Sequence, residues 1–190
     1  MTSEFQAPRF EAGQKGMRVL REFEHDPYHS QEKLPDRTTC PVCHASVRQG
    51  RWRWVSAPDL QSVSQSPPPT QTCPACRRIA AHDPAGIVQI TGAYSVAHRP
   101  EIMALIEHES QREMAQHPLE RIFPAVDNSK YLHTFVKQES KNRLQIWIIA
   151  TTGIHLARAL VHALERSHKG QLTQHYLESE HRVQIQWHRD

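Results

Sequence analysis

Two short runs, "CPVCH" at residues 40–44 and "CPAC" at residues 73–76, decide the fold of the first half of this chain. The chain has four cysteines, and all four lie in these two Cys-Pro-x-Cys pairs. One such pair can be a redox dithiol, half of a metal site or, when a histidine follows, a haem attachment site. Two pairs supply four thiolates, the ligand set of a closed tetrahedral zinc site. We therefore predict one structural Zn²⁺ bound by Cys40, Cys43, Cys73 and Cys76, with His44 as a bystander; the redox dithiol and haem remain the alternatives.

The segment between the two pairs is longer than the roughly 15–20 residues of a compact zinc ribbon. A Ser-, Gln- and Pro-rich stretch, "SVSQSPPPTQ" at residues 62–71, accounts for the extra length as an inserted loop. We expect a zinc-ribbon module over residues 37–83. Residues 1–36 are polar and lack sustained periodicity, so we expect an N-terminal arm there, with at most a short helix near residues 17–23.

Residues 84–190 have the pattern of a larger α/β sandwich domain. Helical patterns follow Pro100 and occupy residues 152–170. We expect strands at residues 86–93, 131–138, 143–150, 171–178 and 182–189. The order is then β-α-β-β-α-β-β. The predicted fold class is α+β: a zinc ribbon followed by a ferredoxin-like sandwich, with an antiparallel sheet and two helices on one face.

The helix over residues 152–170 has the clearest pattern in the chain. Thr152 is a candidate N-cap and Gly170 a candidate stop. Helical spacing predicts that the buried face consists of Ala157, Leu160, Val161 and Leu164. The opposite face carries His155, Arg158, His162, Arg166 and Lys169, which we treat as candidate RNA contacts; most such faces are simply solvated.

A second basic group lies in the predicted zinc module. Its candidate RNA-binding residues are Arg48, Arg51, Arg53, Arg77 and Arg78. In "GRWRW" at residues 50–54, Gly50 marks a turn and arginine then alternates with tryptophan. We expect Trp52 and Trp54 to pack over the metal site, because so small a module has little other core; stacking on nucleobases is the alternative.

Several stretches together resemble an uncharacterised bacterial zinc-ribbon family. They are "CPVC", "GRWRW", "CPACRRI", "PAGIVQITG", "HPLERI", "HLARAL", "KGQL" and "RVQIQWHR", which run from Cys40 to the C-terminus. Paired knuckles before an α/β half are also similar to the N-terminal part of the eukaryotic and archaeal adaptor that exports the large ribosomal subunit. The resemblance implies binding to ribosomal RNA or to a ribosome-bound partner, and implies no reaction.

Catalysis has little support in the sequence. No phosphate-binding glycine loop and no nucleophile elbow is present, and the cysteines are used by the metal. His162 and Glu165 have the spacing of a surface ion pair. We therefore expect a non-enzymatic, cytoplasmic protein with no membrane partner and no small-molecule substrate. The formal net charge of +3 is modest, so the case for RNA depends on the local clusters. A protein-interaction adaptor with a purely structural zinc is the alternative function.

Overall fold

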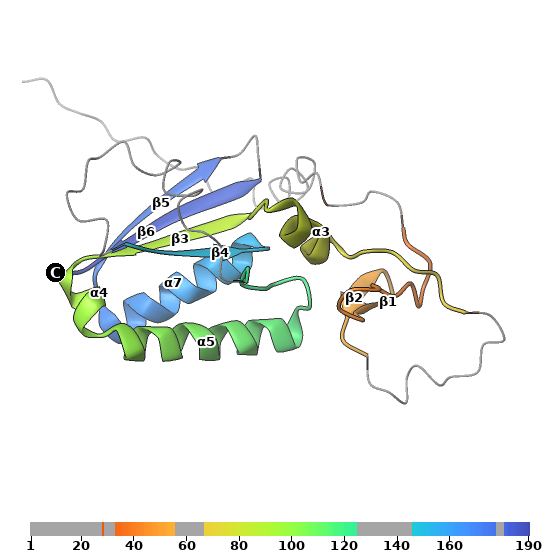
Figure 1. The fold of residues 1–190 in the computed structure, drawn as a ribbon, viewed down its shortest axis with the longest axis horizontal. Coiled ribbons are helices and arrows are strands. Elements are labelled where there is room, and N and C mark those ends of the chain that lie inside the picture. Colours follow the sequence, from red (N-terminus) through yellow and green to blue (C-terminus); the bar gives the residue numbers. More distant parts are fainter. Residues whose placement is uncertain (1–27, 29–32, 56–66, 125–145, 178–180) are drawn as a thin grey trace, which may run out of the picture.

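The computed structural model describes residues 28, 33–55, 67–124, 146–177 and 181–190. These residues form a mixed α+β structure with two sheets. A small module with a two-stranded hairpin and the four cysteines lies at one end, and a four-stranded sheet covered by helices lies at the other (Figure 1). The helix α3 (Pro74–Ala81) leads from the cysteines into the first strand of the larger sheet.

The hairpin pairs β1 (Ser46–Arg48) with β2 (Arg51–Arg53). Its two-residue turn consists of Gln49 and Gly50, whose φ values of 53° and 73° are both positive. Positive φ at both turn positions is typical of a type I′ turn, whose twist matches that of the strands. The prediction of a turn at Gly50 is confirmed.

The larger sheet contains β3 (Gly86–Thr91), β4 (Trp147–Thr151), β5 (Gln171–Leu177) and β6 (Arg182–His188). The strand order is β4-β3-β6-β5. Both outer pairs are antiparallel, but the central pair, β3 with β6, is parallel. The prediction of a wholly antiparallel sheet is therefore wrong. β3 and β6 are far apart in the sequence, so no local pattern indicates whether they pair in parallel or antiparallel.

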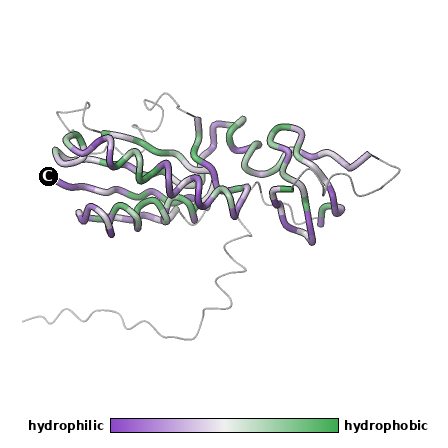
Figure 2. Tube along the Cα trace, turned by 90° about the horizontal axis from the view of Figure 1, so that it is seen from below, coloured by the Kyte–Doolittle hydropathy of each residue, from purple (hydrophilic) through white to green (hydrophobic). Residues whose placement is uncertain are grey.

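Two long helices lie on the same side of this sheet (Figure 1). A short helix, α4 (Ala93–Ala97), leads into α5 (Arg99–Gln116), and α7 (Ile154–His168) packs against α5, β3, β4 and β6. Hydrophobic and hydrophilic residues alternate along these helices, as expected for elements with one buried face (Figure 2). No helix within the described parts of the chain is long and apolar enough to cross a membrane.

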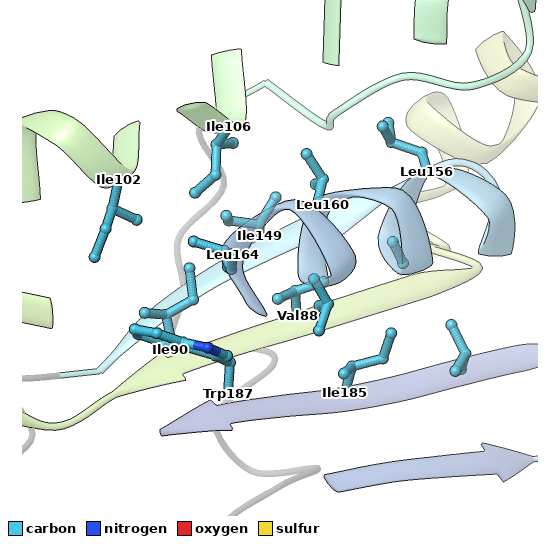
Figure 3. Packing of buried hydrophobic residues seen from close by; sticks show 13 residues of the cluster. Val88, Ile90, Ile102, Ile106, Ile149, Leu156, Leu160, Leu164, Ile185 and Trp187 are labelled. Carbon is cyan, nitrogen blue, oxygen red and sulfur yellow. The ribbon is translucent and has the colours of Figure 1, made fainter. Parts of the chain in front are cut away.

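The main core lies between α7 and the sheet, and Ile102 and Ile106 reach into it from α5 (Figure 3). The predicted buried face of α7 is confirmed, since Ala157, Leu160, Val161 and Leu164 are all fully buried. On β3, Val88 and Ile90 belong to this core. Ile87 instead packs with Phe123 and Ala150, as the alternation of side chains along a strand requires.

The ends of α7 differ from the prediction. Gly153, and not Thr152, is the N-cap residue, and it makes no side-chain cap. The Thr152 hydroxyl donates to the Leu119 carbonyl at 2.6 Å, so it is used elsewhere. At the other end, the helix stops at His168, and Lys169 and Gly170 both have positive φ. The stop predicted near Gly170 is thus confirmed.

Three predicted features fall wholly or partly on residues outside the described ranges. They are the strand at residues 131–138, the arm at residues 1–36 apart from Tyr28 and residues 33–36, and the first half of the insert, residues 62–66. The strand at residues 143–150 is present as β4, shifted toward its C-terminal end. The ferredoxin-like order therefore stays a prediction.

Candidate metal centre

The first cysteine pair lies in a tight turn just before β1. The Cys40 N–H donates to the Ala45 carbonyl at 2.8 Å, and the His44 N–H donates to the Cys40 carbonyl at 2.9 Å. His44 closes this turn with a φ of 64°. Its side chain is exposed, and it does not belong to the group of potential metal ligands formed by the described residues.

The second pair is built on a helix end. Cys73 is the N-cap residue of α3, and its sulfur accepts from the Cys76 N–H at 3.5 Å. Pro74 follows at the first helical position, where a missing N–H costs nothing. The helix thus places the Cys73 and Cys76 sulfurs on the same side of one turn.

Backbone pairing brings the two cysteine pairs together. The Thr39 N–H donates to the Pro69 carbonyl at 2.8 Å, and the Gln71 N–H donates to the Thr39 carbonyl at 3.1 Å. The Cys73 N–H then donates to the Cys40 sulfur at 3.4 Å. The residues that precede the second pair are therefore held beside the first knuckle by main-chain hydrogen bonds.

The four sulfurs form a group that can bind a metal ion. All four lie within 4.8 Å of one another, and none is in a disulfide. Zinc–sulfur bonds of about 2.3 Å in a tetrahedron place neighbouring sulfurs about 3.8 Å apart. The Cys43 and Cys73 sulfurs are 3.7 Å apart. The spacing and the donor set are compatible with one structural zinc.

The electrostatics of the sulfurs also suit a cation. Burial acts to raise the pKa of Cys40, but the N–H groups of Cys73, Cys43 and Val42 outweigh it and lower the pKa to about 6. Burial raises the pKa of Cys73, and the negative charges of Cys43 and Cys76 raise it further. Burial likewise raises the pKa of Cys76. Burial thus disfavours the thiolate forms of Cys73 and Cys76, and a divalent metal bound by the four sulfurs would stabilise the thiolates.

Arg121 is a part of this centre that the sequence did not predict. Its guanidinium donates to the Cys43 sulfur at 3.0 Å and to the Cys76 sulfur at 3.4 Å, and it lies 4.0 Å from the Cys73 sulfur. Burial lowers the pKa of Arg121, but the Cys43 sulfur and the charges of Cys73 and Cys76 raise it above its usual value. Arg121 belongs to residues 117–123, which we call the strap. No local pattern in the strap marks it as a neighbour of residue 43.

The two tryptophans of "GRWRW" have different surroundings. Trp52 is half-buried and packs against the cysteine cluster, as predicted. Trp54 is 40% exposed. Its indole N–H donates to the Met114 carbonyl at 2.6 Å, and the Arg121 guanidinium lies 5.3 Å from its ring centre. Trp54 therefore joins the hairpin to the last turn of α5.

The predicted basic residues of the module divide into two groups. The register puts Arg48, Arg51 and Arg53 on one face of the hairpin and Trp52 on the other, against the cysteines. Arg51 and Arg53 are exposed, and Arg48 is half-buried.

The two arginines of α3 are engaged within the protein. Arg78 is 2% exposed, and it contacts Asp83 at 3.7 Å and the Tyr28 ring at 4.3 Å. Arg77 donates to the Tyr28 carbonyl at 2.6 Å. Arginine is usually exposed, but Arg78 is buried here because the Asp83 carboxylate and the face of the Tyr28 ring contact its guanidinium.

The basic face of α7 is exposed as expected. His155, Arg158, His162, Arg166 and Lys169 are all exposed. His162 Nδ1 and Glu165 Oε2 are 3.7 Å apart, and both side chains are about half exposed. The predicted surface pair between these two residues is confirmed, and it is an ion pair only when the imidazole is protonated.

Comparison of the chain with protein-family models, with curated proteins and with solved structures finds no match.

Proposed function

We propose that this chain is a non-enzymatic zinc-ribbon protein that binds RNA, and that ribosomal RNA or ribosomal particles are its targets. The zinc is structural in this proposal, because four thiolates leave no open coordination position for a substrate. The metal then serves to hold the hairpin and α3 in fixed positions.

One observation carries the proposal: Arg48, Arg51 and Arg53 share one face of a short hairpin. Arg48 and Arg51 are direct cross-strand partners. Arg51 and Arg53 are both exposed, and guanidinium groups can bind phosphate through two donors at once. The opposite face of the hairpin packs against the cysteines through Trp52, so the arginine face is turned away from the metal.

The exposed face of α7 is the second surface that supports RNA binding. Its basic residues recur at three- and four-residue steps over the whole helix. Arg77 and Arg78 are left out of the proposed contacts, since both are held by interactions with Tyr28.

The test is binding of purified ribosomal RNA at several salt concentrations. Affinity should fall linearly with the logarithm of salt concentration, and removing one phosphate contact should reduce that slope by about one unit. Arg51→Gln and Arg53→Gln should each show this reduction. Lys33→Gln removes one exposed positive charge outside the hairpin and is the matched control. If the Arg51→Gln, Arg53→Gln double variant binds with the slope of the wild type, the hairpin face is not the RNA surface.

A protein-interaction adaptor is the second candidate function. Val42 favours it, because this side chain is 65% exposed at the tip of the first knuckle. Binding to a ribosomal protein would be insensitive to salt and sensitive to Val42→Ser. If binding to the protein behaves in this way and no salt-dependent binding to RNA is found, the chain is an adaptor and the RNA proposal is wrong.

A further inference from the structure

The strap brings one permanent positive charge into contact with the cysteine cluster. The Arg121 guanidinium is within hydrogen-bond reach of the Cys43 and Cys76 sulfurs, through two different nitrogens. Arginine remains protonated throughout the physiological pH range. The residue reaches the cluster from the chain segment that follows α5, and not from the zinc module itself.

The guanidinium is held in place from its other sides. Its Nε donates to the Pro118 carbonyl at 2.7 Å, and the Trp54 ring faces it at 5.3 Å. The main-chain N–H of Arg121 donates to the Thr152 hydroxyl at 2.9 Å, which fixes the strap to the end of β4. Arg121 is therefore held by the strap, by Trp54 and by the sulfurs together.

A divalent metal with four thiolates carries a net charge of about −2, and much of the excess charge lies on the sulfurs. Donors to those sulfurs stabilise the charge and reduce the tendency of the sulfurs to attack electrophiles or to take up protons. Main-chain N–H groups already donate hydrogen bonds to the sulfurs of Cys40 and Cys73. Arg121 donates to the other two cysteines.

We infer that Arg121 is a positioning residue for the four-cysteine centre: it neutralises part of the thiolate charge and so makes retention of the metal depend on the α/β sandwich. The inference depends on the four cysteines binding a metal, and it is independent of RNA binding. The zinc module alone would then bind the same ligand set less tightly than the full chain.

The test uses full-length protein loaded with Co²⁺, whose sulfur-to-metal charge-transfer bands report on the thiolates. Hydrogen bonds lower the energy of the sulfur lone pairs, so their loss should move these bands to lower energy. We expect this shift in Arg121→Gln, together with metal transfer to the dye 4-(2-pyridylazo)resorcinol that is about tenfold faster or more. Arg121→Lys keeps the charge but loses the forked donor, and it should fall between Arg121→Gln and the wild type.

Arg112→Gln is the control for general loosening. It removes the ion pairs with Glu109 and Glu113 on α5 but no donor to sulfur, so its charge-transfer bands should stay at the wild-type energy. Unchanged bands and an unchanged release rate in Arg121→Gln would overturn the inference. If Arg121→Gln does not fold, the bands of Arg121→Lys decide in the same way. Failure of the wild type to bind Co²⁺ or Zn²⁺ would overturn both this inference and the metal assignment, whatever the result with RNA.

Discussion

Glu120 and Arg121 are adjacent in the chain, and their side chains bind two different parts of the molecule. The Glu120 carboxylate accepts from the Leu156 N–H, in the first turn of α7, at 3.0 Å. The Arg121 guanidinium donates to the Cys43 sulfur at 3.0 Å. A helix N-terminus attracts a carboxylate, and a thiolate cluster attracts a cation. One peptide unit therefore links the metal centre to the start of α7.

Removing the metal should loosen the first turn of α7. Without the metal, the raised pKa values of Cys73 and Cys76 favour the neutral thiols, so Arg121 loses negative charge beside its guanidinium and the strap that carries Glu120 is held less firmly. We expect the Leu156 amide to exchange its hydrogen faster after chelation, as measured by amide hydrogen exchange. The amide of Ile185, in a central strand, is the control. Unchanged protection at Leu156, while the residues around Cys40 lose theirs, would contradict this link.

The stability of the protein should depend on pH through Glu120. Burial raises the pKa of Glu120, and the Leu156 N–H offsets this only in part. Because the folded pKa lies above the unfolded value, the folded state binds more protons between the two values. The Glu120 contribution is therefore fully present below about pH 4.5 and is lost as pH rises through the folded pKa.

Denaturant unfolding of the wild type and of Glu120→Gln at several pH values measures this contribution. Glutamine can still accept from Leu156 but does not titrate. As pH rises, the unfolding free energy of the wild type should fall relative to that of Glu120→Gln. The pH dependence of metal binding is common to both proteins and cancels in the difference. A difference that is constant with pH would contradict the prediction.

The two faces of α7 should respond oppositely to truncation. Leu160 is fully buried, so Leu160→Ala should cost about 2–5 kcal/mol of unfolding free energy. Arg158 is exposed, and Arg158→Ala should stay within about 0.5 kcal/mol of the wild type. Chemical denaturation measures both values. A larger cost for Arg158 than for Leu160 would mean that the helix packs through its other face.

Two glycines with positive φ should differ in how they tolerate alanine. Gly92 has a φ of 102°, and a Cβ there would overlap the Arg189 backbone. Gly50 has a φ of 73°, and a Cβ there would meet nothing within 4 Å. Gly50→Ala should cost about 1–2 kcal/mol, the cost of left-handed backbone, and Gly92→Ala should cost more. Thermal unfolding of the two variants tests the order.

Features with a local signal could be predicted from the sequence. The cysteine pairs have the spacing of metal ligands, and the apolar residues of α7 repeat at the helical period. The predictions of the cysteine cluster and of the buried face of that helix are therefore confirmed. The helix α3 was missed because only eight residues form it and its N-cap is a cysteine, which is an uncommon capping residue.

Features that depend on contacts between distant residues could not be predicted. Arg121 reaches Cys43 from 78 positions further along the chain. Arg78 is buried because Tyr28 and Asp83 surround its guanidinium, and neither partner follows from the residues next to it. In each case the position of a charge is set by tertiary packing, which a local pattern does not contain.

The parallel pairing of β3 with β6 has a consequence for how the protein folds during synthesis. β6 is the last strand of the described chain, yet it lies in the middle of the sheet. Until the ribosome has released it, β3 can pair with β4 on one side only, and its other edge stays open to unwanted strand pairing. The cysteines leave the ribosome much earlier, so metal can bind to a nascent chain whose sheet is still half-formed. Assembly of the cysteine cluster and completion of the sheet are therefore two separate steps during synthesis.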